Sequence, residues 1–176
     1  MSETWQIEGE RPGWGGYLPL TTRTYRLPDG TRADWDIYGG ERSVAILALT
    51  ADGQVVLARQ FRPGPALVLD ELPGGNVEPG EDVLAAAGRE LLEETGYAGD
   101  LELAGTDWMA SACRTRRYAA VARNAVTVAE PSPEAGEFCE VVLKPLDDFR
   151  SHLRAGQLTD VDLGYLALDH LGLLAD

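Results

Sequence analysis

Alternating and continuous apolar runs divide most of the chain into short strands. The segments SVAILALT (43–50) and QVVLARQF (54–61) are apolar enough for strands buried on both faces, and the turn ADG between them predicts a hairpin. The segment ALVLDEL (66–72) predicts a further strand that ends before Pro73. These runs indicate the centre of a sheet.

The N-terminal part has a different pattern. The segment TYRLPDGTRADWDIY (24–38) contains two alternating runs joined by LPDG, which predicts a hairpin with a proline entering the turn. We therefore expect two parts, a small β arm at 1–42 and a main domain at 43–176. Trp35 alternates with Ile37 on the arm, which suggests packing against a second copy of the chain.

Helical spacing begins at Glu81 and runs to Thr95, and Gly96 stands where a left-handed C-cap is expected. The later part of the chain predicts three strands and then two helices, with Thr159 or Asp160 capping the second helix. These elements are the segments 101–110, 116–128, 139–146, 146–156 and 161–174. The order of strands, helix, strands and helices predicts an α/β fold with a sheet covered on both faces.

The helix carries an unusual cluster of charge. At about 100° per residue, Glu90, Glu93 and Glu94 share one arc opposite the apolar positions, so we expect them to face outward together. The cluster alone is typical of a solvated amphipathic helix, in which Arg89 offsets part of the repulsion. Carboxylates at this spacing also offer hard oxygen ligands to Mg²⁺ or Mn²⁺.

The surrounding residues favour the metal site. Gly75 lies six residues before Glu81, and the run from Arg89 to Tyr97 completes the pattern GX5EX7REUXEEXGU, in which U is an apolar residue. Every specified position is filled. This pattern resembles the signature of the Nudix hydrolases, whose fold is an α/β/α sandwich with a mixed sheet.

The resemblance implies Mg²⁺-dependent hydrolysis of a nucleoside diphosphate linked to another moiety, with two or three divalent ions polarising the phosphoryl oxygens. Mn²⁺ is a possible substitute. Glu90 and Glu94 are implied as the strongest direct ligands, then Glu93, while Glu81 is an outer or occasional ligand. A carbonyl of the Gly74–Gly75 pair offers a further oxygen, with Gly74 as the candidate. Arg89 is expected to orient these glutamates by bidentate contacts.

Net charge limits the classes of molecule that the protein is expected to bind. The formal charge of −14 argues against a duplex DNA or RNA partner, and it would repel an anionic pyrophosphate unless cations mediate the binding. No apolar run approaches the roughly 20 residues that span a bilayer, and the first residues lack a signal-peptide pattern, so a cytoplasmic location is expected. Cys113 and Cys139 are expected to be free thiols in or near the core.

The order of the arm, VVLARQFRPG and LDELPGG looks like the ADP-ribose pyrophosphatase branch, and this resemblance covers residues 17–170. It implies a homodimer formed through the arm, and an arginine near the substrate that maps to Arg62. Pairing of Arg62 with Asp70 or Glu71 is the alternative. Members that cleave ADP-ribose usually carry a proline in a loop beyond the signature, and WMASACRTRRYAAV has none. Arg114, Arg116 and Arg117 stand there instead, as a basic patch for phosphate or as ordinary surface charge with a local partner.

The branch also places a general base in the loop before the last strand. The segment PSPEAGEFCEVV offers Glu134, Glu137 and Glu140, of which Glu137 aligns best and Glu134 second. His152 and His170 are expected to be structural or exposed. Two alternatives stay open: the same chemistry on a dinucleoside polyphosphate, NADH or another sugar nucleotide, and a sensor that binds ADP-ribose without turnover.

Overall fold

A computed structural model of the chain describes residues 6–13, 19–133 and 138–174. The chain forms two compact units. The first contains Met1–Glu41 and the loop Trp108–Arg116, and the second contains Arg42–Asp107 and Arg117–Asp176.

The first unit is a three-stranded antiparallel sheet, in the order β1 (Gln6–Pro12), β2 (Leu20–Arg26) and β3 (Arg32–Tyr38). The predicted hairpin is β2–β3, and its turn is closed by Asp29, whose carboxylate accepts hydrogen bonds from the backbone N–H and the hydroxyl of Thr31. Strand β1 was not predicted, because QIEGERP lacks apolar alternation. Backbone pairing joins it to β2, and two ion pairs, Arg11–Asp34 and Arg23–Glu10, link it to the neighbouring strands.

The loop Trp108–Arg116 is joined to the end of β3 by the backbone. Tyr38 N–H donates to Ala112 O at 3.1 Å, and Arg114 N–H donates to Tyr38 O at 2.9 Å. Gly39 follows with φ 71°, and a Cβ there would stand 2.4 Å from Thr115 Oγ1. Only glycine permits both the left-handed backbone and this close approach.

The second unit is built on one sheet of seven strands. Their order is β10-β5-β4-β9-β8, with β6 added beside β5 and β7 beside β4. The strands are β4 (Arg42–Leu49), β5 (Gln54–Arg62), β6 (Leu67–Glu71), β7 (Gly74–Val77), β8 (Tyr97–Trp108), β9 (Arg116–Thr127) and β10 (Glu140–Pro145).

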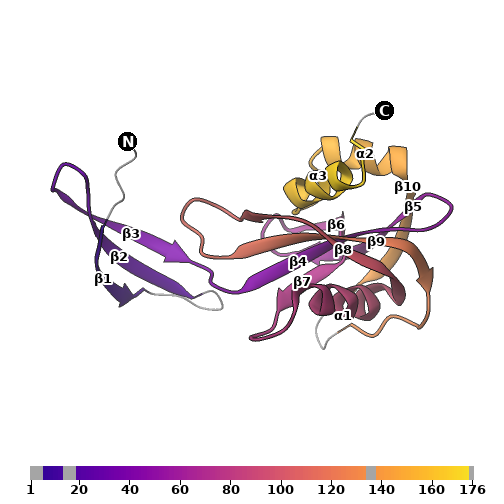
Figure 1. The fold of residues 1–176 in the computed structure, drawn as a ribbon, viewed down its shortest axis with the longest axis horizontal. Helices are drawn as coiled ribbons and strands as arrows, with labels where there is room; N and C mark the ends of the chain where they lie inside the picture. Colours follow the sequence, from indigo (N-terminus) through magenta and orange to yellow (C-terminus); the bar gives the residue numbers. More distant parts are fainter. Residues whose placement is uncertain (1–5, 14–18, 134–137, 175–176) are drawn as a thin grey trace. The chain divides into compact units, whose positions relative to one another are not determined.

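Helices cover both faces of this sheet, as Figure 1 shows: α1 (Val83–Thr95) lies on one face, and α2 (Leu146–Arg154) and α3 (Val161–His170) lie on the other. Along β4, Val44 and Ile46 pack with α1 residues, whereas Ala45 and Leu47 pack with α2 and α3 residues. Period-two alternation therefore makes both faces of this strand apolar. The predicted α/β/α sandwich is confirmed.

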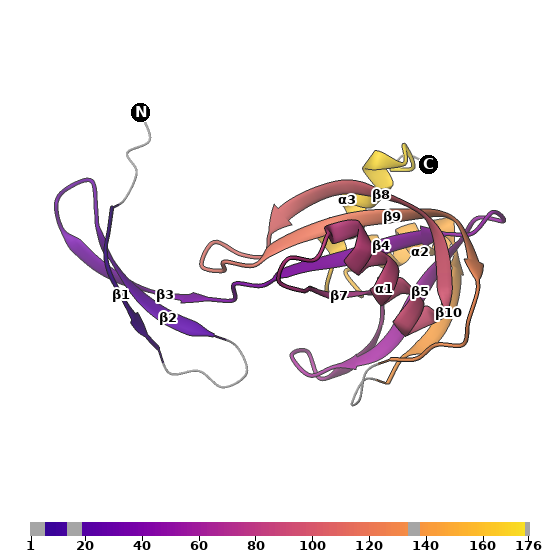
Figure 2. The ribbon, with the colours of Figure 1, turned by 60° about the horizontal axis from the view of Figure 1, so that its bottom comes forward.

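The rotated view brings α1 in front of the sheet (Figure 2), where it packs against β7, β4, β5 and β10. Strand β7 was missed in the sequence, because GGNV has almost no side-chain pattern. Its position is fixed by antiparallel pairing with β4. The helix begins at Val83, two residues later than predicted, because Asp82 is its N-cap. No helix among the described residues is long and apolar enough to cross a membrane.

Candidate active site

Helix α1 sets the position of the clustered glutamates. The Asp82 carboxylate accepts hydrogen bonds from the N–H groups of Leu84 and Ala85, and this capping starts the helix. Gly96 ends it in the left-handed conformation, with φ 73°, and donates to Leu92 O. The expected C-cap is confirmed, and both ends of the helix are fixed around Glu90, Glu93 and Glu94.

Glu94 is the most buried acidic side chain of the cluster, with 3% of the residue exposed. One carboxylate oxygen accepts the Gly74 N–H at 2.9 Å. The other lies 3.4 Å from Gln60 Nε2 and 3.8 Å from Cys139 Sγ. The expectation that the three glutamates face outward together is wrong for Glu94, because β7 and the β5 side chains cover this end of the arc. Leu92, an apolar residue of the same helix, is 39% exposed.

Glu90 lies against the backbone of Gly75. A Cβ on Gly75 would stand 2.5 Å from Glu90 Oε1 and 2.7 Å from Oε2. The same oxygen, Oε1, accepts a hydrogen bond from Arg89 Nη1 at 2.8 Å. The absence of a side chain at Gly75 therefore lets this carboxylate approach β7.

Arg89 contacts three of the four acidic residues of the signature. Its Nε donates to Glu81 Oε1 at 3.1 Å, and its Nη1 donates to Glu93 Oε2 at 3.2 Å as well as to Glu90. Its Nη2 also donates to the Asn76 carbonyl at 3.0 Å, which ties the cluster to β7. Hydrogen bonding to Glu81, with that to Glu90, raises the pKa of Arg89 despite partial burial.

Glu81 stands just before the helix and is held from several sides. Its Oε2 accepts the Glu78 N–H at 2.9 Å, and its backbone carbonyl accepts from Arg42 Nη2 at 2.8 Å. The hydrogen bond from Arg89, together with that from Glu78, lowers the pKa of Glu81 below its ordinary value. The carboxylate is thus kept ionised and oriented.

The donor set fits a hard divalent cation. Carboxylate oxygens predominate, and the Gly75 backbone leaves space that a Cβ would fill beside Glu90. Among the described residues no three His, Cys, Asp or Glu side chains converge as a complete set of ligands for one ion. Mg²⁺ keeps several waters and binds through one or two carboxylates together with substrate phosphates, so it does not need such a set.

The predicted substrate arginine, Arg62, lies on β5 and pairs with Glu71, with 3.6 Å between Arg62 Nε and Glu71 Oε1. This is the alternative that the sequence left open. Asp70, the other possible partner, instead pairs with Arg59 and Lys144. Glu71 is fully buried and also accepts hydrogen bonds from the N–H and hydroxyl of Thr159. The arginine is therefore positioned by a buried carboxylate.

Of the two readings that the sequence left open for the three arginines, a basic patch or charge with a local partner, the second holds for Arg117. Arg117 is 5% exposed and belongs to the second unit, where it pairs with Asp107, Asp160 and Asp162. Arg114 and Arg116 belong to the first unit. Successive side chains of a strand point to opposite faces. Arg117 therefore points into the fold, whereas Arg116, the residue before it on β9, points the other way.

The two preferred base candidates, Glu134 and Glu137, lie outside the described residues. Glu140 begins β10 and has a 71% exposed side chain, 4.0 Å from Arg59. His152 is buried, with Nε2 2.8 Å from the Asp70 carbonyl, and His170 pairs with Glu102 on the surface. Both histidines are structural or exposed, as expected, and both cysteines are free thiols.

A cavity of about 480 Å³ adjoins Glu94, because Gln60 and Cys139 contact Glu94 and also line the cavity. Its other walls are largely exposed apolar and charged side chains: Arg59, Phe61, Val68, Pro133, Phe138 and Glu140. No sequence pattern marked Cys139 as a neighbour of the site. Gln60 could have been found from the sequence. It lies two residues before Arg62, and side chains two apart on a strand face the same side.

Comparisons with known proteins agree with this geometry. The model of the NUDIX domain matches residues 39–161. An ADP-sugar pyrophosphatase of Mus musculus is 35% identical over 163 residues, which is 80% of this chain and 73% of that protein. An ADP-ribose pyrophosphatase of Bacillus subtilis (strain 168) is 36% identical over 83 residues, which is 47% of this chain and 45% of that protein. The match thus spans less than half of the bacterial relative.

The fold also has a counterpart among solved structures. The crystal structure of an ADP compounds hydrolase superposes with a TM-score of 0.80 at 21% identity, and the match covers 97% of both chains. These matches confirm the resemblance to the ADP-ribose pyrophosphatase branch that the signature and the flanking motifs indicated. The chain therefore belongs to the Nudix hydrolase family.

Proposed function

We propose that the protein hydrolyses the pyrophosphate bond of ADP-ribose or a related nucleotide sugar in a Mg²⁺-dependent reaction. The observation that carries the proposal is the placement of the α1 carboxylates against Gly74 and Gly75, where oxygen ligands and backbone meet. The names of the relatives support the substrate class, since both are pyrophosphatases of ADP-ribose or ADP-sugars.

In this proposal Glu90 and Glu94 hold Mg²⁺ directly, and Glu93, Glu81 and the Gly74 carbonyl complete or support the site. Bound dications would neutralise phosphoryl charge and lower the pKa of the attacking water. The residues of the chain do the positioning. Burial of Glu94 and its bond from Gly74 hold that carboxylate at one place before any ligand binds.

Arg89 orients the other three carboxylates of the signature. It bridges Glu81, Glu90 and Glu93, so their mutual repulsion is balanced by one guanidinium that itself stays 28% exposed. Supporting contacts of this kind typically change metal affinity or activity by about 10–100-fold. A glutamate of the loop before β10, with Glu137 preferred over Glu134, is assigned as general base.

The cavity beside Glu94 is the proposed place of the substrate group nearest the cleaved bond. Arg62, held by the buried Glu71, is assigned to the substrate phosphates. The absence of a proline in WMASACRTRRYAAV favours a second candidate, a nucleoside diphosphate with a different sugar or base. The reaction is the same in both cases.

We also propose a homodimer formed through the first unit. Trp35 on β3 is 46% exposed and Ile7 on β1 is 56% exposed, so this sheet offers apolar contact area to a second copy of the chain. Light scattering on the full chain would measure the mass, and a monomer at working concentration would contradict the proposal. Trp35→Ser should weaken the dimer.

The activity is tested by phosphate analysis of products from ADP-ribose, other nucleotide sugars, dinucleoside polyphosphates and NADH, with Mg²⁺ or Mn²⁺. We expect turnover of ADP-ribose or a nucleotide sugar, lost in Glu94→Gln. The matched control is Glu102→Gln, an exposed glutamate paired with Arg123. Tight ADP-ribose binding without any turnover would favour the sensor and overturn the enzyme, and full activity of Glu94→Gln would overturn the metal assignment.

A further inference from the structure

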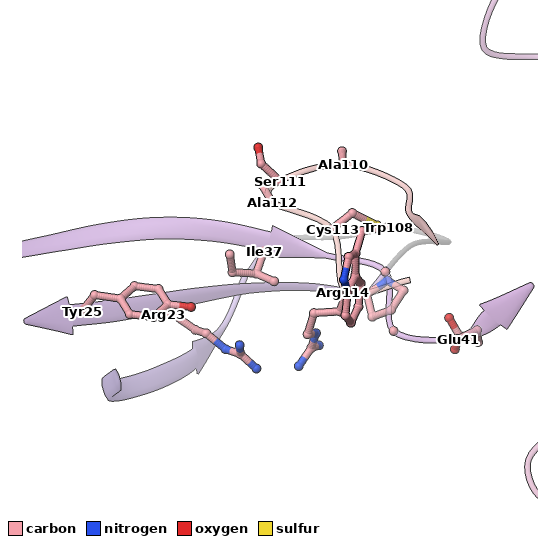
Figure 3. A pocket seen from close by; sticks show the side chains of 13 residues that line it. Arg23, Tyr25, Ile37, Glu41, Trp108, Ala110, Ser111, Ala112, Cys113 and Arg114 are labelled. Atoms are coloured by element: carbon pink, nitrogen blue, oxygen red, sulfur yellow. The ribbon is translucent and has the colours of Figure 1, made fainter. Parts of the chain in front are cut away.

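Two arginines among the described residues have a buried Nε–H without a hydrogen-bond acceptor, Arg62 and Arg114. Arg114 and Glu41 line a cavity of the first unit (Figure 3), and Arg114 Nη1 lies 3.4 Å from the partly exposed Glu10. The partner of Arg62, in contrast, is the fully buried Glu71. A buried N–H without an acceptor costs free energy. The contacts of Glu71 explain why this cost is present at Arg62.

The oxygens of Glu71 are occupied by another residue. Thr159 donates its hydroxyl and its backbone N–H to Glu71 Oε2, each at 2.9 Å, and the same N–H lies 3.2 Å from Oε1. Arg62 Nε lies 3.6 Å from Glu71 Oε1, which is within ion-pair distance but too long for a hydrogen bond. Arg62 is therefore held by charge, while the hydrogen bonds of Glu71 go to Thr159.

Thr159 lies in the connector between α2 and α3, and this connector is attached to β6. The buried His152 joins the two, because its Nε2 lies 2.8 Å from the Asp70 carbonyl and its Nδ1 lies 3.3 Å from Gln157 Oε1. Glu71, the next residue of β6, accepts the bonds from Thr159. Two consecutive residues of β6 thus hold this side of the connector.

The other side of Thr159 is anchored on β9. Asp160, the next residue, has its carboxylate 3.3 Å from Arg117 Nη1, and Asp162 pairs with the same guanidinium. Arg117 is buried and is held in turn by Asp107, with 2.7 Å between Nη2 and Oδ2. Breaking a buried ion pair leaves an uncompensated charge, so such pairs resist rearrangement. Thr159 therefore lies in a segment that is fixed on both sides.

We propose that Thr159 is a positioning residue for the phosphate-binding arginine. By occupying the oxygens of Glu71, it keeps Arg62 from forming a short hydrogen bond to that carboxylate, so the guanidinium stays available to substrate phosphates. The Arg62 side chain is 29% exposed although its Nε is buried, so its exposed part lies at other atoms. The inference rests on the proposed hydrolysis and assigns one more residue to the same site.

The physical basis is competition between two anions for one guanidinium. Charge-assisted hydrogen bonds between a guanidinium and a carboxylate are roughly twice as strong as neutral ones. A Glu71 carboxylate that is free to form such a bond would have to be displaced by the substrate phosphate. The hydroxyl of Thr159 removes this competitor, and the unpaired Nε–H of Arg62 is the cost of keeping the arginine ready.

Thr159→Val tests the hydroxyl alone, because the side chain keeps its shape and the backbone N–H remains. With ADP-ribose and Mg²⁺, or the nucleotide sugar that is turned over fastest, KM should rise by about 2–10-fold, the worth of one net hydrogen bond. The kcat should stay unchanged, since the phosphate contact is present before and during the reaction. Thr159→Ser, which retains the hydroxyl, should restore the wild-type KM.

Thr50→Val is the matched control. The hydroxyl of Thr50 also donates to a carboxylate, that of Asp52, but in the turn between β4 and β5. A second comparison places Thr159→Val in an Arg62→Gln protein, where it should leave KM unchanged, because the residue through which it acts is gone. A merely structural Thr159 would raise KM by the same factor in both backgrounds, which would overturn the proposal.

NMR of the arginine Nε–H groups gives a measurement without substrate or metal. The Arg62 signal is assigned by its absence in Arg62→Lys. In Thr159→Val this proton signal should move downfield, because the Nε–H gains a hydrogen bond to Glu71, and it should stay in place in Thr159→Ser and Thr50→Val. An unchanged signal in Thr159→Val would overturn the proposal.

The two measurements separate this inference from the proposed function. A moved Nε–H signal with unchanged KM would show that Thr159 orients Arg62 without serving the substrate, and would overturn the role in hydrolysis. A wild-type protein that turns over no nucleotide would overturn the proposed function itself, and the Nε–H signal would still decide whether Thr159 sets the state of Arg62. A moved signal together with a selective rise in KM supports the proposal.

Discussion

The Glu90 carboxylate lies so close to Gly75 that a single Cβ on the glycine would stand 2.5 Å from Glu90 Oε1. The contact joins the helix to β7 at the centre of the candidate metal site. It also gives the signature glycine a physical role, because here the requirement is for space and not for an unusual backbone angle. Gly75 is not among the glycines with positive φ.

Gly75→Ala should therefore displace Glu90 while leaving the backbone of β7 possible. We expect kcat/KM to fall by about 10²-fold, since a displacement near 1 Å at a catalytic group has that effect. Gly64→Ala is the control, because a Cβ at Gly64 meets nothing within 4 Å. An active Gly75→Ala enzyme would show that the Glu90 position is unimportant.

Arg89→Lys tests the orienting role of the guanidinium. Lysine keeps the charge but cannot reach Glu81, Glu90 and Glu93 together, so kcat/KM should fall by about 10–100-fold and the apparent Mg²⁺ affinity should fall with it. Arg123→Lys, at an exposed pair with Glu102, is the matched control. Equal Mg²⁺ dependence in both variants would contradict an orienting role.

The pair of Arg89 and Glu81 makes stability depend on pH. Hydrogen bonding from Arg89 lowers the pKa of Glu81, so its contribution to stability is present above the ordinary pKa of glutamate. That contribution is lost as the pH falls through the lowered pKa of the folded state. Thermal unfolding of the wild type and of Arg89→Lys should differ most near neutral pH and converge in acid.

The sequence was sufficient for what depends on side-chain pattern. Apolar runs at 43–50 and 54–61 predicted the central strands, and both faces are buried along Val44–Ala48 and Val55–Ala58. Helix α1 and its glycine cap followed from periodicity and from Gly96. The signature spacing identified the glutamates, since the spacing is itself a property of the sequence.

What depends on tertiary contact was not predictable. Strand β7 has few side chains, and its pairing with β4 buries Glu94 by contacts that no local pattern encodes. The burial of Arg117 arises in the same way, since its acidic partners come from β8 and the start of α3. The sequence left a basic patch and a local partner open for these arginines, and only the tertiary contacts decide for Arg117.

The buried network of Arg117 predicts a large loss of stability. In Arg117→Gln, Asp107 and Asp160 would lose the guanidinium that compensates their burial, so unfolding free energy should fall by about 3–5 kcal/mol. Arg123→Gln should have little effect, because that arginine is exposed. Urea unfolding at about pH 7.5 measures both.

The pH dependence of the same variant has a definite sign. Burial raises the pKa of Asp107 and of Asp160, so folding favours their protonated forms. Without Arg117 the preference increases, and stability rises as the pH falls through the raised pKa. The deficit of Arg117→Gln should therefore shrink at about pH 5.5. A deficit that grows in acid would show that these aspartates are not desolvated.

Single substitutions test which glutamate is the general base. Glu137→Gln should lower kcat by about 10²-fold with little change in KM, and should remove the acidic limb of the kcat profile, since glutamine cannot accept the proton of water. Glu134→Gln should retain most activity. Glu130→Gln is the control, because Glu130 is exposed and lies just before the segment PSPEAGEFCEVV. Loss of activity in Glu134→Gln alone would transfer the role to Glu134. Full activity in both would remove this loop from the chemistry, because neither preferred carboxylate would then be needed to activate the water.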